Sequence, residues 1–158
     1  MNAHTIPPVI KTLRVEAPVA RAFDVFAGGI DRWWPHSGSF GKSPLRSVKI
    51  EPRQGGNWVE TDADGVERVI ATVTHWEPPH RLVMTWYAGV SAILEDKRNA
   101  SELEVRFSPE GPNATQVALT HHKFGAVDAV EGAKIRAAVE NGWPMLLKLF
   151  ADETQRAA

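Results

Sequence analysis

The chain has no cysteine among its 158 residues. This absence excludes disulfide bonds, thiolate nucleophiles and cysteine-ligated zinc, and it is typical of the reducing cytoplasm, which is the location we expect. An excess of charge of one sign is also lacking, because 18 basic and 19 acidic side chains give a net charge of −1. Neither nucleic acid nor an anionic membrane surface is therefore an expected partner.

Long hydrophobic runs and the usual catalytic motifs are missing as well. No apolar stretch approaches the roughly 18 residues of a membrane span. MNAHTIPPVIKTLRV lacks a basic segment followed by an apolar core, so we expect no secretory signal in it. GxSxG, P-loop, GxGxxG and HExxH patterns do not occur, so we expect no cofactor and no metal. The length suits one domain over residues 1–158, with a core of about residues 10–155.

Alternating apolar and polar residues predict an antiparallel sheet. SELEVRFSP places Leu103, Val105 and Phe107 on one face, and QVALTHH returns after the turn EGPNAT with His121 in the same inward phase. Further strands are predicted in IKTLRVEAP, RSVKIEP, GGNWVET, VERVIATVTHWE and RLVMTWYAG, with turns at DADG and PPH. Strands this short and closely spaced indicate a meander rather than parallel units.

Two short helices and one long helix complete the predicted α+β class. PVARAFDVFAGG predicts the first short helix and IDRWWP the end of the second, while AKIRAAVENGWPMLLKLFADETQ predicts a long amphipathic helix. Its apolar stripe consists of Ile135, Val139, Trp143, Leu146, Leu147 and Phe150. Pro144 lacks an amide N–H, so we expect a kink or a restart near Gly142. A long helix across a curved sheet is expected to leave an interior cavity.

Five segments carry a family resemblance when they are taken in order. VEAPVARAFDVF, GGNWVETDADG, VTHWEPPHRLVMTW, LEVRFSPEGPNATQVALTHHKFG and NGWPMLLKLF together resemble the activator-of-heat-shock-protein-ATPase-homologue-like (AHSA-type) family of the START/birch-pollen-allergen-like (SRPBCC) superfamily. The resemblance implies a helix-grip fold, in which a curved antiparallel sheet, two short helices and a long C-terminal helix enclose a cavity. Members of such families include binders, chaperone cofactors and cyclases, so the fold alone does not give the function. Residues 88–100 depart from the family pattern and are expected to extend the sheet or to cover the cavity mouth.

The histidines offer few candidates for a metal site or an acid–base pair. His75 and His80 flank WEPP and are expected to be solvated turn residues. His121 and His122 are adjacent on a strand, so they point to opposite faces and cannot bind one ion together. His121 faces inward and matches a recurrent histidine of the family that the chain resembles. It is either a core histidine that is hydrogen-bonded to a neighbouring element, or a polar or acid–base group in the cavity.

Trp58 and Glu60 lie two residues apart on one predicted strand, so they share a face. If Trp58 lines the cavity, Glu60 is a carboxyl group beside it, and burial would raise its pKa toward a catalytically useful value. Together with His121 it would then form the one acid–base pair that the pattern suggests. The alternatives place Glu60 at a solvated rim or in an ion pair with Arg68.

The six tryptophans are expected to divide between packing and ligand contact. Trp76 and Trp143 are expected to fill the core. The cavity-lining tryptophans are expected to be Trp34, Trp58 and Trp86. Adjacent residues on a helical turn point about 100° apart, so we expect Trp33 to anchor the short helix while Trp34 faces the cavity. SGSFG, which follows, is expected to act as a gate.

These observations favour binding of a small, largely hydrophobic molecule in the cavity, with a few polar anchors in an apolar wall. The predicted ligand-binding residues are Trp34, His36, Trp58, Glu60, Trp86 and His121. One alternative is a cyclase or hydro-lyase-type enzyme that uses Glu60 or His121 as general base. The other is a protein-interaction module like the chaperone cofactors, with a chaperone as partner. A homodimer is expected on base rates alone.

Overall fold

The structure is a computed structural model that describes residues 6–37, 43–90 and 92–156. Its elements confirm the predicted α+β class and every predicted strand. In chain order they are β1 (Val9–Val15), α1 (Val19–Ala27), α2 (Ile30–Trp33), β2 (Leu45–Ile50), β3 (Asn57–Asp62), β4 (Glu67–Glu77), β5 (Arg81–Trp86), the 3₁₀ helix η1 (Lys97–Asn99), β6 (Ser101–Pro109), β7 (Thr115–His122) and α3 (Ala129–Arg156). The gate expected in SGSFG lies mostly outside the described residues.

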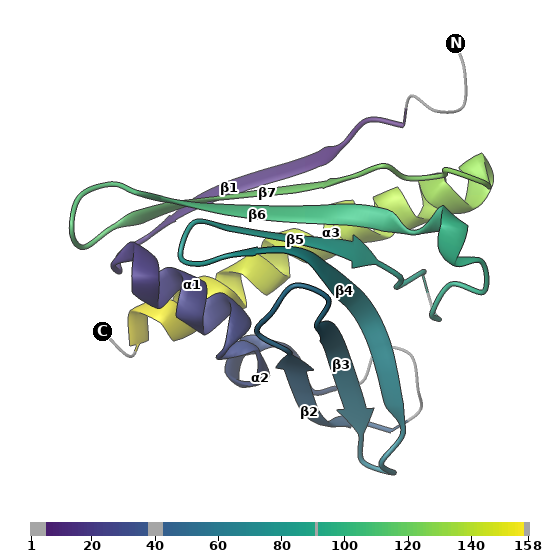
Figure 1. Cartoon of the computed structure of the whole chain (residues 1–158), viewed down its shortest axis with the longest axis horizontal. Coiled ribbons are helices and arrows are strands. Elements are labelled where there is room, and N and C mark those ends of the chain that lie inside the picture. The colour runs from purple at the N-terminus through teal and green to yellow at the C-terminus, as the bar shows by residue number, and fades with distance from the viewer. Residues whose placement is uncertain (1–5, 38–42, 91, 157–158) are drawn as a thin grey trace.

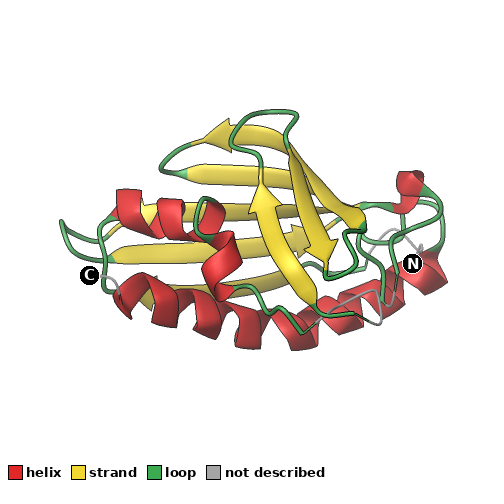
Figure 2. Ribbon diagram, turned by 90° about the horizontal axis from the view of Figure 1, so that it is seen from below, coloured by secondary structure: helices red, strands yellow, loops and turns green. Residues whose placement is uncertain are grey.

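The seven strands form one antiparallel sheet in the order β1-β7-β6-β5-β4-β3-β2. The sheet curls over the long helix α3, and α1 and α2 lie near the C-terminal part of α3 (Figures 1 and 2). The register shifts between Leu45 and Ser47 in β2, between Trp58 and Val59 in β3, and between Val73 and His75 in β4. Because such irregularities bend a strand and increase its twist, they account for the strong curvature of this part of the sheet.

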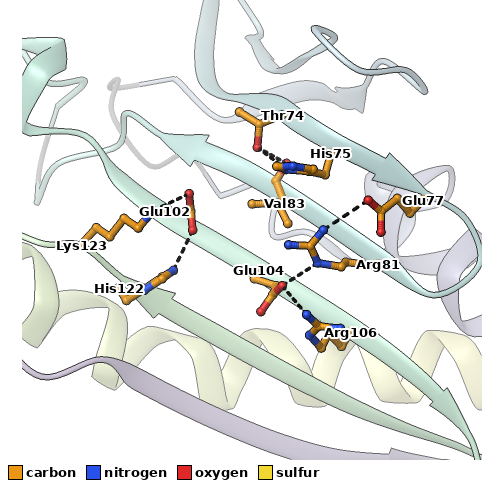
Figure 3. A network of polar contacts seen from close by, with 10 residues as sticks. All are labelled: Thr74, His75, Glu77, Arg81, Val83, Glu102, Glu104, Arg106, His122 and Lys123. Atoms are coloured by element: carbon orange, nitrogen blue, oxygen red, sulfur yellow. Dashed lines mark hydrogen bonds and ion pairs between the residues drawn. The ribbon is translucent and has the colours of Figure 1, made fainter.

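The two faces of the sheet have opposite character, as the sequence alternation predicts. On the inner face, β6 and β7 bury apolar side chains together with Ser101, Thr115 and His121. The outer face carries a polar network in which Glu104 accepts a hydrogen bond of 2.7 Å from the Arg81 Nε, as Figure 3 shows. The inner face is therefore the one that packs against α3.

The two predicted turn histidines, His75 and His80, have different surroundings. His80 lies exposed in the turn between β4 and β5, as expected. His75 is exposed but belongs to β4, where its Nδ1 is 3.3 Å from the Thr74 hydroxyl (Figure 3). His75 is therefore solvated, as predicted, but it lies in the strand predicted in VERVIATVTHWE and not in the turn.

Helix α3 begins at a hydrogen-bonded cap and runs without interruption. The Asp128 carboxylate accepts hydrogen bonds from the backbone N–H groups of Val130 and Glu131, which is typical of a helix N-cap. Of the kink or restart predicted near Gly142, the restart is wrong, since the helix continues through Pro144 to Arg156. Its apolar side chains pack against the sheet on both sides of the proline, and this packing compensates for the missing backbone hydrogen bond. No helix among the described residues is long and apolar enough to cross a membrane.

The close approach between the β7–α3 loop and α3 depends on two glycines. A Cβ at Gly132 would overlap the backbone of Gly125, so a side chain does not fit at Gly132. Gly125 has a φ of +74°, a backbone conformation that favours glycine. These glycines set the position of the first turns of α3 against the end of the sheet.

Candidate functional site

Four tryptophans meet in the interior between the sheet and α3. Trp34 follows α2, Trp58 lies on β3, Trp86 ends β5, and Trp143 lies on α3. Their ring centroids are 4.8 Å apart for Trp34 and Trp58, 5.3 Å for Trp58 and Trp86, 5.8 Å for Trp86 and Trp143, and 6.3 Å for Trp143 and Trp34. The side chains therefore form a closed ring of contacts, which we call the tryptophan cluster.

The sheet register brings two members of the cluster together. Ala71 on β4 pairs with Trp58 on one side and with Trp86 on the other. Because the alanine side chain is small, the two indoles can meet above it, and their rings are nearly perpendicular at 86°. Edge-to-face contacts of this kind are favourable for aromatic pairs.

The adjacent residues Trp33 and Trp34 have different roles, as expected. The Trp33 indole N–H donates a hydrogen bond of 3.0 Å to the backbone carbonyl of Val25, and its ring packs against Phe26 and Phe150. The backbone leaves the helix at Trp34, where ψ is 133°. The Trp34 indole turns inward and is half-buried, so it is the least buried member of the tryptophan cluster.

Glu60 is a buried carboxyl group beside the cluster, with 1% of its surface exposed. Its Oε2 accepts a hydrogen bond of 2.9 Å from the Trp34 indole N–H. The predicted alternative of a solvated rim is wrong for Glu60, because it is buried. The Arg68 guanidinium bonds Asp62, at 3.1 Å. Asp62 draws Arg68 to the end of the strand, where its carboxylate also accepts backbone N–H groups of the β3–β4 turn.

His121 is fully buried and both of its ring nitrogens are engaged. Its Nδ1 accepts a hydrogen bond of 3.1 Å from the Trp143 indole N–H, and its Nε2 lies 2.8 Å from the Ser101 hydroxyl. Since an indole N–H only donates, Nδ1 carries no proton and Nε2 donates to Ser101. Desolvation, with a smaller effect of His122, lowers the pKa of His121 to about 3. His121 is thus a neutral core histidine that orients Trp143, and this geometry argues against a role as general base.

A family model described as activator of Hsp90 ATPase homolog 1-like protein matches residues 16–154. The chain belongs to this family. Membership confirms the resemblance seen in the sequence and agrees with the helix-grip arrangement of the curled sheet and α3. A search of curated protein sequences finds no match.

The chain is also similar to several solved structures. The anthrahydroquino-γ-pyrone synthase Txn09 is 36% identical, with 96% of this chain and 99% of that chain covered and a TM-score of 0.67. CalC from Micromonospora echinospora, described as a self-sacrificing resistance protein, is 26% identical, with coverages of 99% and 98% and a TM-score of 0.68. An HSP90 activator from Plasmodium falciparum is 19% identical, with coverages of 86% for both chains and a TM-score of 0.60, and shares the fold.

Within this fold, the predicted ligand-binding residues fall into two places. Five of them lie in or beside the tryptophan cluster, namely Trp34, Trp58, Glu60, Trp86 and His121. His36 instead places its Nε2 2.9 Å from the backbone carbonyl of Asp31, at the edge of the sheet next to β2. Its ring therefore turns back toward α2.

Sequence reasoning missed the part that Trp143 has in the cluster. Its position on the apolar stripe of α3 predicts core packing, which the structure also shows. Its contact with Trp34 and its hydrogen bond to His121 join segments that are far apart in the chain. No local pattern encodes such contacts.

Four pockets lined by described residues have volumes of about 380 to 590 Å³, and none of the six predicted ligand-binding residues lines them. The most apolar is an outer groove of about 380 Å³ between α1 and the β4–β5 turn, which includes Phe23, Trp76, Pro78 and Pro79. Another is lined by Val90 and residues of α3. Val90 belongs to the segment after β5, in which Ala88 and Ile93 form one isolated antiparallel bridge with each other.

Proposed function

We propose that the chain binds a planar, largely apolar small molecule between the sheet and α3, at the tryptophan cluster. The observation that carries this proposal is the convergence of four indoles from four separate segments of the chain on one point of the interior. Flat aromatic ligands gain both buried area and ring contacts at such a site. The similarity to a synthase of a fused-ring product, at 36% identity over nearly the whole chain, supports this class of ligand.

The surroundings of the cluster define its chemistry further. Trp34 is its least buried member, so the ligand enters beside this ring, which lies at the end of α2. Glu60 contributes a buried carboxyl group beside this ring, where it accepts a hydrogen bond from the Trp34 indole N–H. The burial of the cluster favours a neutral ligand over an ion, because a charged ligand would lose its hydration there.

Calorimetric titration with 9-fluorenone, a neutral planar tricycle, tests the proposal. The wild-type chain is expected to bind one equivalent, and Trp86→Leu is expected to weaken binding at least about tenfold because it opens the cluster. Trp76→Phe is the matched control, since Trp76 lies in the outer groove and contacts Phe23. Loss of binding in Trp76→Phe with full binding in Trp86→Leu would place the ligand in the outer groove and contradict the proposal.

A second candidate function is ring closure catalysed at the same site, with Glu60 as general base. Its support is the buried carboxyl group inside an aromatic site and the similarity to a synthase. 2′-Hydroxychalcone is a suitable probe, because closure moves the phenolic proton through the base to the α-carbon while the phenolic oxygen bonds the β-carbon. Catalysis predicts that Glu60→Gln abolishes flavanone formation but keeps 9-fluorenone binding. No acceleration by the wild-type chain would leave binding as the function.

A further inference from the structure

One member of the tryptophan cluster has an unused hydrogen-bond donor. Trp58 is fully buried, and its indole Nε1 has no acceptor among the residues that the structure describes. Two other indoles of the cluster differ in this respect: the N–H of Trp34 donates to Glu60 and that of Trp143 donates to His121. Trp58 thus stands out as an interior indole whose donor has not been matched.

An unmatched buried donor is uncommon because it loses its hydrogen bond to water and gains nothing in return. The groups closest to Trp58 in the cluster are the rings of Trp34 and Trp86. Ring faces accept N–H groups only weakly. An acceptor on a bound ligand would satisfy this buried donor.

We propose that the Trp58 indole N–H anchors a neutral carbonyl oxygen of the bound molecule, so that the ligand class is a planar aromatic ketone or quinone. This inference rests on the proposed function and deepens it. A carbonyl oxygen accepts a hydrogen bond without donating one, which matches a group that only donates. Such ligands also carry the flat ring system that the surrounding indoles contact.

The burial of Trp58 selects against charged acceptors. Its side chain is fully buried. A ligand carboxylate that accepted from Trp58 would lose its hydration in the interior, which costs free energy. A ketone would bring an acceptor without a charge.

A pair of probes that differ in one oxygen atom isolates the anchor. 9-Fluorenone and fluorene share the same planar skeleton, and only the first has a carbonyl group. The wild-type chain is expected to bind 9-fluorenone about tenfold more tightly than fluorene, in line with one matched buried donor. In Trp58→Phe this preference is expected to fall to about twofold or less, whereas the control Trp76→Phe, outside the cluster, keeps it.

The indole resonances provide a readout that packing alone would not move. In ¹H–¹⁵N spectra, the Trp58 Nε1 proton, assigned by its loss in Trp58→Phe, is expected to shift downfield on addition of 9-fluorenone and much less with fluorene. If Trp58→Phe does not fold, two measurements on the wild-type chain test the anchor. They are the ratio of the affinities for 9-fluorenone and fluorene, and the shift of the Nε1 proton of the indole nearest the ligand.

Each outcome of these titrations bears on one hypothesis. Binding of both probes with equal affinity, or a preference that persists in Trp58→Phe, overturns the anchor and leaves the proposed function intact. Binding of neither probe overturns the proposed function. Tighter binding of fluorene-9-carboxylate than of 9-fluorenone refutes the assignment to neutral carbonyl ligands.

Discussion

Mild acid should destabilise the protein through His121. This side chain is fully buried, and desolvation lowers its pKa to about 3 in the folded state. In the unfolded chain a histidine titrates near its ordinary value of about 6.5. Between these values the unfolded state binds a proton that the folded state does not, so stability is complete above pH 6.5 and is lost as the pH falls toward 3.

The size of the effect follows from the difference in pKa. Each pH unit below 6.5 lowers the free energy of unfolding by about 1.4 kcal/mol, so the loss at pH 5 is about 2 kcal/mol. The pKa of Asp62 is held below its usual value by the backbone N–H of Val66, so this carboxylate stays ionised in the window. With a urea dependence of about 2 kcal/mol per M, the unfolding midpoint should fall by about 1 M between pH 7 and pH 5.

Urea unfolding followed by tryptophan fluorescence at both pH values measures this loss. His121→Gln cannot titrate but keeps a side-chain acceptor for the Trp143 N–H, so its loss between pH 7 and pH 5 should be smaller by about 2 kcal/mol. His75→Gln replaces an exposed histidine and should behave like the wild-type chain. An unchanged pH dependence in His121→Gln would refute the buried, neutral state of His121.

Two further predictions concern stability, and thermal or urea unfolding measures both. Gly132→Ala should lower the free energy of unfolding by about 2 kcal/mol, because the new Cβ would overlap the Gly125 backbone. Gly142→Ala, at an open position of α3, should raise the free energy of unfolding by about 0.5–1 kcal/mol. Equal effects of the two substitutions would contradict the close approach of Gly132 to Gly125. Trp33→Phe should cost about 2 kcal/mol, because it removes a buried hydrogen bond to Val25 along with ring contacts, and no loss would contradict the anchoring role.

The elements of the fold were predictable from local patterns. The strict alternation in SELEVRFSP gives β6 with the bounds that the structure shows, since each apolar residue of that stretch meets the same inner face. Different directions for Trp33 and Trp34 were expected from helix geometry, and they are found, although α2 ends at Trp33 and the backbone is extended at Trp34. The restart expected near Gly142 does not occur. That prediction considered only the local loss of a backbone hydrogen bond at Pro144, whereas α3 also packs against the sheet before and after the proline.

The partners of polar groups were much less predictable than the elements. The sequence places Glu60 and Arg68 on neighbouring strands, but it does not reveal that Asp62 takes the guanidinium and that Trp34 reaches Glu60. These choices depend on side-chain directions across segments that are distant in the chain. The structure of the segment after β5 could not be predicted either, since a single bridge between Ala88 and Ile93 leaves no periodic pattern in the sequence.

The most direct test of the account is to locate a bound ligand by intermolecular NOEs in the complex with 9-fluorenone. The account predicts NOEs from the fluorenone protons to the indole protons of Trp34, Trp58, Trp86 and Trp143. NOEs to Phe23 and Trp76 instead would place the molecule in the outer groove. That result would contradict the central claim that the tryptophan cluster is the ligand site.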